Sequence, residues 1–123
     1  MGEEKRSSIR WKTKIRVAYS LAGVDEFYKE VFTEDISEKG LQILAADKLK
    51  LKQAVKLKLE FVYDSVPIAV MGTVVYLKEH GNQCRVGLEF INMDTFQSHR
   101  LRRGLERIRQ ELKDEAGERG ARQ

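Results

Sequence analysis

The chain is poor in the residues that crosslink small proteins or bind metals. It contains one cysteine, one proline and two histidines among 123 residues. The lone Cys84 cannot form a disulfide within the chain, which fits a reducing compartment, and no Cys and His have metal-ligand spacing. The longest run without a charged residue, 65–77, is too short to span a bilayer. We therefore expect a cytoplasmic protein with no metal, no cofactor and no membrane insertion.

Catalytic motifs are also missing. The sequence has no GxxxxGK[ST] loop, no GxGxxG and no HExxH. No serine or cysteine is set up with a plausible base, and His99 lies beside Arg100 as a solvated helical histidine would. Most carboxylates are next to Lys or Arg, as on a solubilising surface. We predict that the protein is not an enzyme.

What the chain does have is enough apolar sequence for one modest core. It is 41% hydrophobic and 34% charged, with both signs mixed and a net charge of +4. This length and composition predict a single domain. The mildly basic balance is compatible with an anionic ligand but is far below that of a nucleic-acid coat protein.

The middle of the chain alternates apolar and polar residues with the period of a β-strand. The pattern predicts six short strands, with a hairpin turn at His80-Gly81-Asn82. The fifth is apolar on both faces, so we expect it to be covered on both. Strands at this spacing indicate a small antiparallel barrel or closed sandwich. The expected strands are 15–21, 27–36, 41–45, 55–61, 67–77 and 84–90.

After residue 92 the apolar period becomes helical. Leu101, Leu105, Ile108 and Leu112 predict a stripe that packs on the barrel, and Asp94 predicts the start of the helix. We divide the chain into a flexible N-terminal arm (1–12), a barrel with its C-terminal helix (13–114) and a disordered tail (115–123).

Two short segments carry side chains suited to an anionic ligand. Arg6 and Arg10 lie four residues apart ahead of the first strand, and arginine binds phosphate or the guanine O6/N7 edge in a bidentate manner. Taken alone, this pair of arginines is better explained as a solvated basic arm. The second segment, 35–40, places Asp35 and Ser37 on one strand face and ends in Gly40, where a positive φ or a close backbone approach would favour glycine. Alone, it could equally be an ordinary turn.

Together the two segments resemble the signature of the PilZ domain family, bacterial receptors for cyclic di-GMP. The family has RxxxR and then [DN]xSxxG, here Arg6-Ser-Ser-Ile-Arg10 and Asp35-Ile-Ser-Glu-Lys-Gly40. Val86-Gly-Leu-Glu-Phe90 also looks like the family's last core strand. The resemblance covers residues 5–112 and implies a fold that is mainly β: a six-stranded antiparallel PilZ-like barrel with a C-terminal α-helix.

The resemblance also implies the site and the function. Arg6 and Arg10 would bind phosphates and guanine edges, Asp35 and Ser37 would hydrogen-bond a guanine, and Gly40 would let the backbone come close. Lys5, just before the motif, would have a supporting role. The implied protein is a stand-alone cyclic di-GMP receptor that relays its signal to a separate protein, with the arm ordered by the ligand.

Other possibilities remain open at this stage. Trp11 follows the second arginine and is either a core plug or a stacking surface for a base. The main alternative function is a ligand-independent protein–protein interaction module of PilZ-like fold. Nucleic-acid binding through the arginines of the helix is disfavoured, because acidic residues are interspersed there and the strands lack an exposed row of aromatics.

Overall fold

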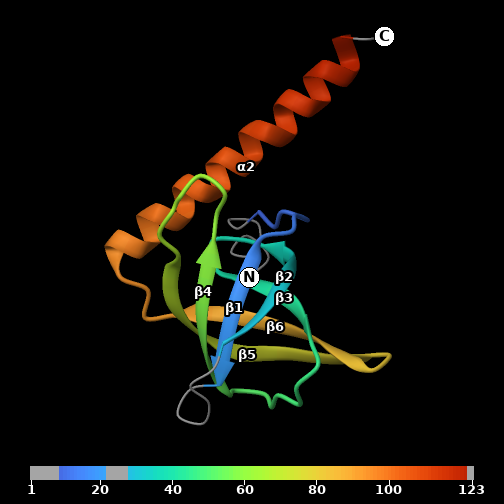
Figure 1. Ribbon diagram of the computed structural model, residues 1–123, viewed down its shortest axis with the longest axis vertical. Coiled ribbons are helices and arrows are strands. Elements are labelled where there is room, and N and C mark those ends of the chain that lie inside the picture. Colours follow the sequence, from blue (N-terminus) through green and yellow to red (C-terminus); the bar gives the residue numbers. More distant parts are fainter. Residues whose placement is uncertain (1–8, 22–27, 122–123) are drawn as a thin grey trace, which may run out of the picture.

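The structure is a closed antiparallel barrel with one long helix (Figure 1). This computed structural model describes residues 9–21 and 28–121, with side chains up to residue 113. The strands close in the order β1-β2-β3-β6-β5-β4. The prediction of six antiparallel strands and a C-terminal helix is confirmed. The elements are β1 (Arg16–Leu21), β2 (Lys29–Ile36), β3 (Gly40–Ala45), β4 (Ala54–Glu60), β5 (Ile68–His80), β6 (Gln83–Ile91) and α2 (Thr95–Ala121).

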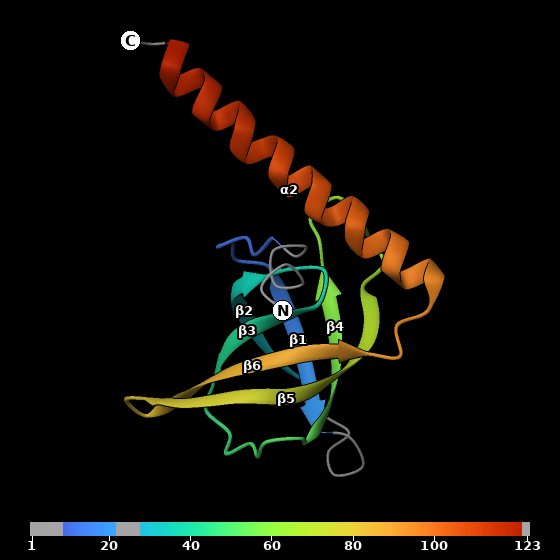
Figure 2. The same cartoon turned by 180° about the vertical axis from the view of Figure 1, so that it is seen from behind.

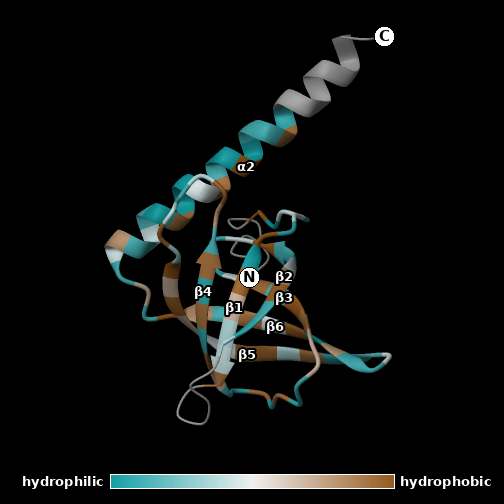
Figure 3. Ribbon diagram, viewed as in Figure 1, coloured by the Kyte–Doolittle hydropathy of each residue, from teal (hydrophilic) through white to brown (hydrophobic). Residues whose placement is uncertain are grey.

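The alternating sequence pattern explains the barrel core. On β4, Val55, Leu57 and Leu59 point inward and are at most 1% exposed, whereas Lys56 and Lys58 are exposed. Figure 3 shows the same alternation of hydrophobic and hydrophilic bands along the strands. Each fully buried aliphatic side chain contributes about 1.5–3 kcal/mol. The inward row of every strand therefore adds to one continuous core.

Two irregularities interrupt the alternation. β2 is bulged between Thr33 and Asp35, and β5 between Val74 and Tyr76. The expectation that β5 is covered on both faces is wrong: Ala69 is already exposed before the second bulge, and from the bulge onward Val75 is 54% and Tyr76 43% exposed. This end of β5 extends past β4 and pairs only with β6 (Figure 2). The β5–β6 hairpin turns at Gly81, whose φ of 64° is the left-handed conformation that glycine adopts easily.

The helix α2 begins where the sequence predicts. The Asp94 carboxylate accepts a hydrogen bond from the Gln97 backbone N–H at 2.7 Å, the bond that an N-cap residue makes. Leu101, Leu105 and Ile108 are at most 7% exposed against the end of the barrel. None of the described helical segments has the length and apolar character that crossing a membrane requires.

The apolar stripe predicted on the helix extends one residue too far, to Leu112. Leu112 is 41% exposed, because α2 has passed the rim of the barrel by this residue and projects away from it (Figure 1). The helix itself continues to Ala121. Residues 115–121 contain no proline to stop it. The division of the chain into an arm (1–12), a domain (13–114) and a tail (115–123) stays a prediction.

Arg100 fixes α2 to the loop between β4 and β5. Its side chain is only 12% exposed, and its Nε and Nη2 lie 3.1 and 2.6 Å from the Asp64 Oδ2. It also donates to the backbone carbonyls of Val66 and Pro67. This pairing holds the pKa of the Asp64 carboxyl below its usual value. The helix is therefore docked by a charged contact at its first turns and by apolar contacts along its middle.

Candidate functional site

The segment 35–40 forms the end of β2, a tight turn and the start of β3. The Ser37 N–H donates to the Gly40 carbonyl at 2.8 Å, and the Lys39 N–H donates to the Ser37 Oγ at 3.2 Å. Ser37 is fully buried, and its hydroxyl also lies 3.4 Å from the Gly40 carbonyl. The serine therefore holds the turn together from inside.

The first described residues of the chain are paired to this turn. Trp11 and Ile36 exchange two backbone hydrogen bonds of 2.8 and 3.0 Å, an isolated antiparallel bridge. Ile36 points into the core, so its neighbour Asp35 faces outward as the period-2 pattern predicts. The bridge thereby brings Arg10 next to Asp35, 25 residues further along the chain.

Arg10 contacts both polar members of the motif. Its Nε donates to the Asp35 Oδ1 at 2.9 Å, and its Nη2 lies 2.9 Å from the same oxygen. Its Nη1 lies 3.4 Å from the Ser37 Oγ. The side chains of Arg10 and Asp35 are 45% and 17% exposed, so the pair lies at the surface with one side open to solvent.

This arrangement leaves binding capacity on both partners. A guanidinium has five N–H donors, and these contacts use at most three of them. On Asp35 only Oδ1 has a hydrogen-bond partner among the described residues. As far as the described residues show, the site therefore has unused N–H donors on Arg10 beside an unused oxygen of Asp35. This polarity suits a ligand that carries both an anion and N–H donors.

Gly40 is required by packing within the barrel. A Cβ at this position would lie 2.0 Å from the Leu88 carbonyl oxygen and 3.1 Å from the Glu89 Cα on β6. Gly40 is not among the described residues with positive φ. Of the two reasons for glycine that the sequence suggested, close backbone approach is the one the structure shows, and the approaching backbone is that of β6.

The other predicted site residues have different outcomes. Lys5 and Arg6 lie outside the described residues. Trp11 is partly buried and packs against the hydrophobic core, as a plug would. With Ile9, Leu105 and other residues, Trp11 also lines a groove of about 580 Å³ between the start of the chain and α2.

One contact near the motif has no signal in the sequence. Glu38, inside the turn, accepts a hydrogen bond from the Arg102 Nε of α2 at 2.8 Å. The two residues are 64 positions apart, and neither fits a motif. The contact links the turn to the helix at the surface. Over the described part of the chain, no group of His, Cys, Asp or Glu has an arrangement that could hold a metal ion.

Comparison with known proteins gives one family. The model of the PilZ domain matches residues 4–107. Among curated proteins, no sequence matches the chain.

Solved structures resemble this one in fold. The PilZ domain of YcgR from Escherichia coli, determined with c-di-GMP, has a TM-score of 0.72 at 13% identity, over 92% of this chain and 98% of that one. The Bacillus subtilis inhibitor of motility, MotI/DgrA, has a TM-score of 0.69 at 15% identity, over 88% of this chain and 52% of that one. The chain thus spans about half the length of MotI/DgrA.

Proposed function

This chain belongs to the PilZ domain family, and from this membership and the geometry around Asp35 we propose that it is a receptor for cyclic di-GMP. The observation that carries the proposal is the contact of Arg10 with both Asp35 and Ser37. The two halves of the motif lie far apart in the sequence and come together on the outside of the barrel. The structure of a domain with the same fold, the PilZ domain of E. coli YcgR, has been determined with this ligand.

The chemistry of the site matches that of the ligand. Cyclic di-GMP carries two phosphates and two guanines, and a guanine offers N–H donors on one edge and the O6 and N7 acceptors on another. The N–H groups of Arg10 that Asp35 and Ser37 do not use suit a phosphate or the O6/N7 edge, since charge-assisted bonds of this kind are the stronger ones. The second Asp35 oxygen, Oδ2, suits the donor edge of the guanine. Arg6 would complete the phosphate contacts.

Ser37 and Gly40 act in this proposal by shaping the site. Because Ser37 is buried and its hydroxyl is engaged in the turn, it orients Arg10 and the backbone of the motif. Direct hydrogen bonding of Ser37 to a guanine stays a prediction. Lys5 has a supporting role next to Arg6. The family consists of regulatory binding domains, so binding followed by a change of surface, rather than catalysis, is the proposed action.

The signal then passes to a separate protein. Above the rim of the barrel, a groove of about 640 Å³ lies between α2 and the loop after β4. Tyr63 and Phe96 line it, and Val62 and Val66 on the same loop are 95% and 59% exposed. Exposed aromatic and aliphatic side chains beside arginines are typical of protein interfaces. This groove is our candidate surface for the partner.

Calorimetric titration of cyclic di-GMP tests the receptor function. We expect saturable binding to the wild-type protein and its loss in Arg10→Ala. Arg16→Ala is the matched control, because Arg16 is also about half exposed and ion-paired, with Glu30 on β2, but lies outside the motif. This control should bind like the wild type, and the titration end point will give the number of nucleotides per chain.

The same titration distinguishes a receptor from the main alternative function. If the folded wild-type protein gives no binding signal, the receptor proposal is wrong and a ligand-independent interaction module of the same fold takes its place. Equal weakening in Arg10→Ala and Arg16→Ala would show that net charge, not the motif, attracts the nucleotide.

A further inference from the structure

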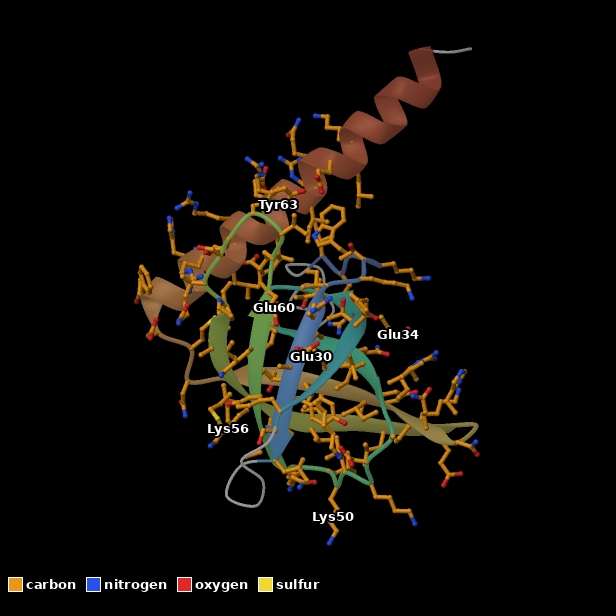
Figure 4. The ribbon with its side chains drawn as sticks, viewed as in Figure 1. Glu30, Glu34, Lys50, Lys56, Glu60 and Tyr63 are labelled. Carbon is orange, nitrogen blue, oxygen red and sulfur yellow. The ribbon has the colours of Figure 1, made fainter. Side chains whose placement is uncertain are left out.

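A second charged surface lies away from the motif. The segment 48–58 contains five lysines and no acidic residue. All five lysines are exposed. We call these five lysines, together with Leu51, the lysine surface. The five are Lys48, Lys50, Lys52, Lys56 and Lys58. Figure 4 shows Lys50 and Lys56 projecting from the lower part of the barrel, away from Glu34 and Glu60.

The tip of this surface is a hydrogen-bonded turn that exposes a leucine. The Gln53 N–H donates to the Lys50 carbonyl at 3.1 Å, and the Gln53 Oε1 accepts from the Lys50 N–H at 2.9 Å. Lys52 has a φ of 70°, and its N–H donates to the Val74 carbonyl at 2.7 Å. Leu51, between the two lysines, is 59% exposed. The turn thus holds an apolar side chain outward with a cation on each side.

On β4, the direct cross-strand partners of the surface lysines carry no acid. Lys56 and Lys58 are flanked by β1 and β5, and none of their four cross-strand partners carries a carboxylate. Lys58 instead lies 4.3 Å from the ring centroid of Tyr28, which is itself 37% exposed. The four partners are Ala18, Ser20, Ala69 and Met71.

Within the described part of the chain, no carboxylate is paired with the lysine surface. Six of the eight arginines with described side chains, in contrast, pair with carboxylates: Arg10, Arg16, Arg85, Arg100, Arg102 and Arg109. A surface of unpaired like charges is stabilised by an external layer of opposite charge.

We infer that the lysine surface docks on the anionic headgroups of a lipid membrane. Lysines near such a surface are attracted to it without needing a fixed geometry, and an exposed leucine beside them can enter the interface between headgroups and chains. An acidic protein partner fits less well, because fixed carboxylates are bound best by arginine forks, and the surface has no arginine. Single-stranded nucleic acid fits less well too, because stacking successive bases needs several exposed aromatics, and of the neighbours named above only Tyr28 is aromatic.

The surface and the nucleotide site lie at opposite ends of the barrel. The turn 37–39 follows the end of β2, whereas the loop before β4 follows the end of the antiparallel β3 (Figure 1). A membrane-bound molecule would therefore keep the motif open to solvent. The inference does not depend on the proposed receptor function, and it is tested without nucleotide.

Sedimentation with vesicles tests it. The wild-type protein should bind vesicles containing phosphatidylglycerol at low salt and not vesicles of phosphatidylcholine alone. Lys50→Gln/Lys52→Gln/Lys56→Gln should weaken the binding roughly 100-fold, from about 1 kcal/mol for each lysine. The matched control, Lys14→Gln/Lys78→Gln/Lys113→Gln, loses the same charge elsewhere and should stay within about threefold of the wild type. Leu51→Ser should lower the part of the binding that resists salt.

Three outcomes would overturn the inference. The first is no binding of the folded wild-type protein to anionic vesicles, and the second is equal weakening in both triple variants. In the third, the protein binds polyglutamate or an oligonucleotide but not the vesicles, which would assign the surface to an acidic protein or to nucleic acid. Circular dichroism of each variant establishes that it is folded before it is compared.

Discussion

Gly40→Ala is a test of why the binding motif ends in glycine. The new Cβ would lie 2.0 Å from the Leu88 carbonyl oxygen, whereas non-bonded heavy atoms are optimally separated by roughly 3.5 Å. The obstacle is backbone, so relief requires β3 and β6 to separate by about 1 Å or more. Overpacking of this kind costs about 1–3 kcal/mol. Separation would also weaken the 2.8 Å bond from the Phe90 N–H to the Lys39 carbonyl, worth about 1 kcal/mol.

We therefore expect Gly40→Ala to lower the free energy of unfolding by about 3 kcal/mol in the absence of any ligand. Urea unfolding followed by circular dichroism measures this. Gly81→Ala is the control, because a Cβ at that position would meet nothing within 4 Å and only the φ of 64° opposes alanine. It should cost about 1 kcal/mol. If Gly40→Ala costs no more than Gly81→Ala, the close approach to β6 is not the reason for the glycine, and a ligand-related role becomes the better explanation.

Two further predictions concern the helix. Leu101→Ala should lower the free energy of unfolding, measured in urea, by about 2–5 kcal/mol, because Leu101 is only 1% exposed. Leu112→Ala should stay within about 0.5 kcal/mol of the wild type, because Leu112 is 41% exposed. Equal effects of the two substitutions would mean that α2 packs differently. Since Arg100 lowers the pKa of Asp64 in the folded state, the ionised carboxylate stabilises the protein above the usual carboxyl pKa, and this contribution is lost as the pH falls through the lowered value. The stability difference between wild type and Asp64→Asn should therefore be larger at about pH 7 than at about pH 2, and a difference independent of pH would contradict the Arg100 pairing.

The sequence predicted the strands well because a barrel has an inside and an outside along every strand. Val55, Leu57 and Leu59 alternate with lysine, and that alternation alone places β4. The bulges of β2 and β5 could not be predicted, since each depends on how two neighbouring strands pair. The end of the buried helix stripe was missed for a similar reason. Helical periodicity continues to Leu112, but where the barrel stops beneath the helix is a property of the tertiary structure.

The candidate site was predicted only in part. The spacing of Asp35 and Ser37 placed the carboxylate correctly on the outer face, but the burial of Ser37 follows from the tight turn at Gly40. That Arg10 meets Asp35 depends on a backbone bridge between Trp11 and Ile36, which no local pattern indicates. The resemblance to the family motif assigned Arg10, Asp35 and Ser37 to one site, although their contact could not be predicted from local patterns. Glu38 and Arg102 matched no motif, so their contact was missed.

The strand order has a consequence for how the protein folds. Each half of the barrel, β1–β2–β3 and β4–β5–β6, is a meander of strands that are neighbours in the sequence, and only the β1–β4 and β3–β6 pairings join the halves. Neither three-stranded half encloses a core, so each gains most of its stability only when both joins form. Closing such long-range contacts carries the loop-closure cost that makes β-rich domains fold slowly. The barrel should therefore fold and unfold as one cooperative unit. Cleavage of the loop 46–53 would separate the two halves and leave two sheets with open edges.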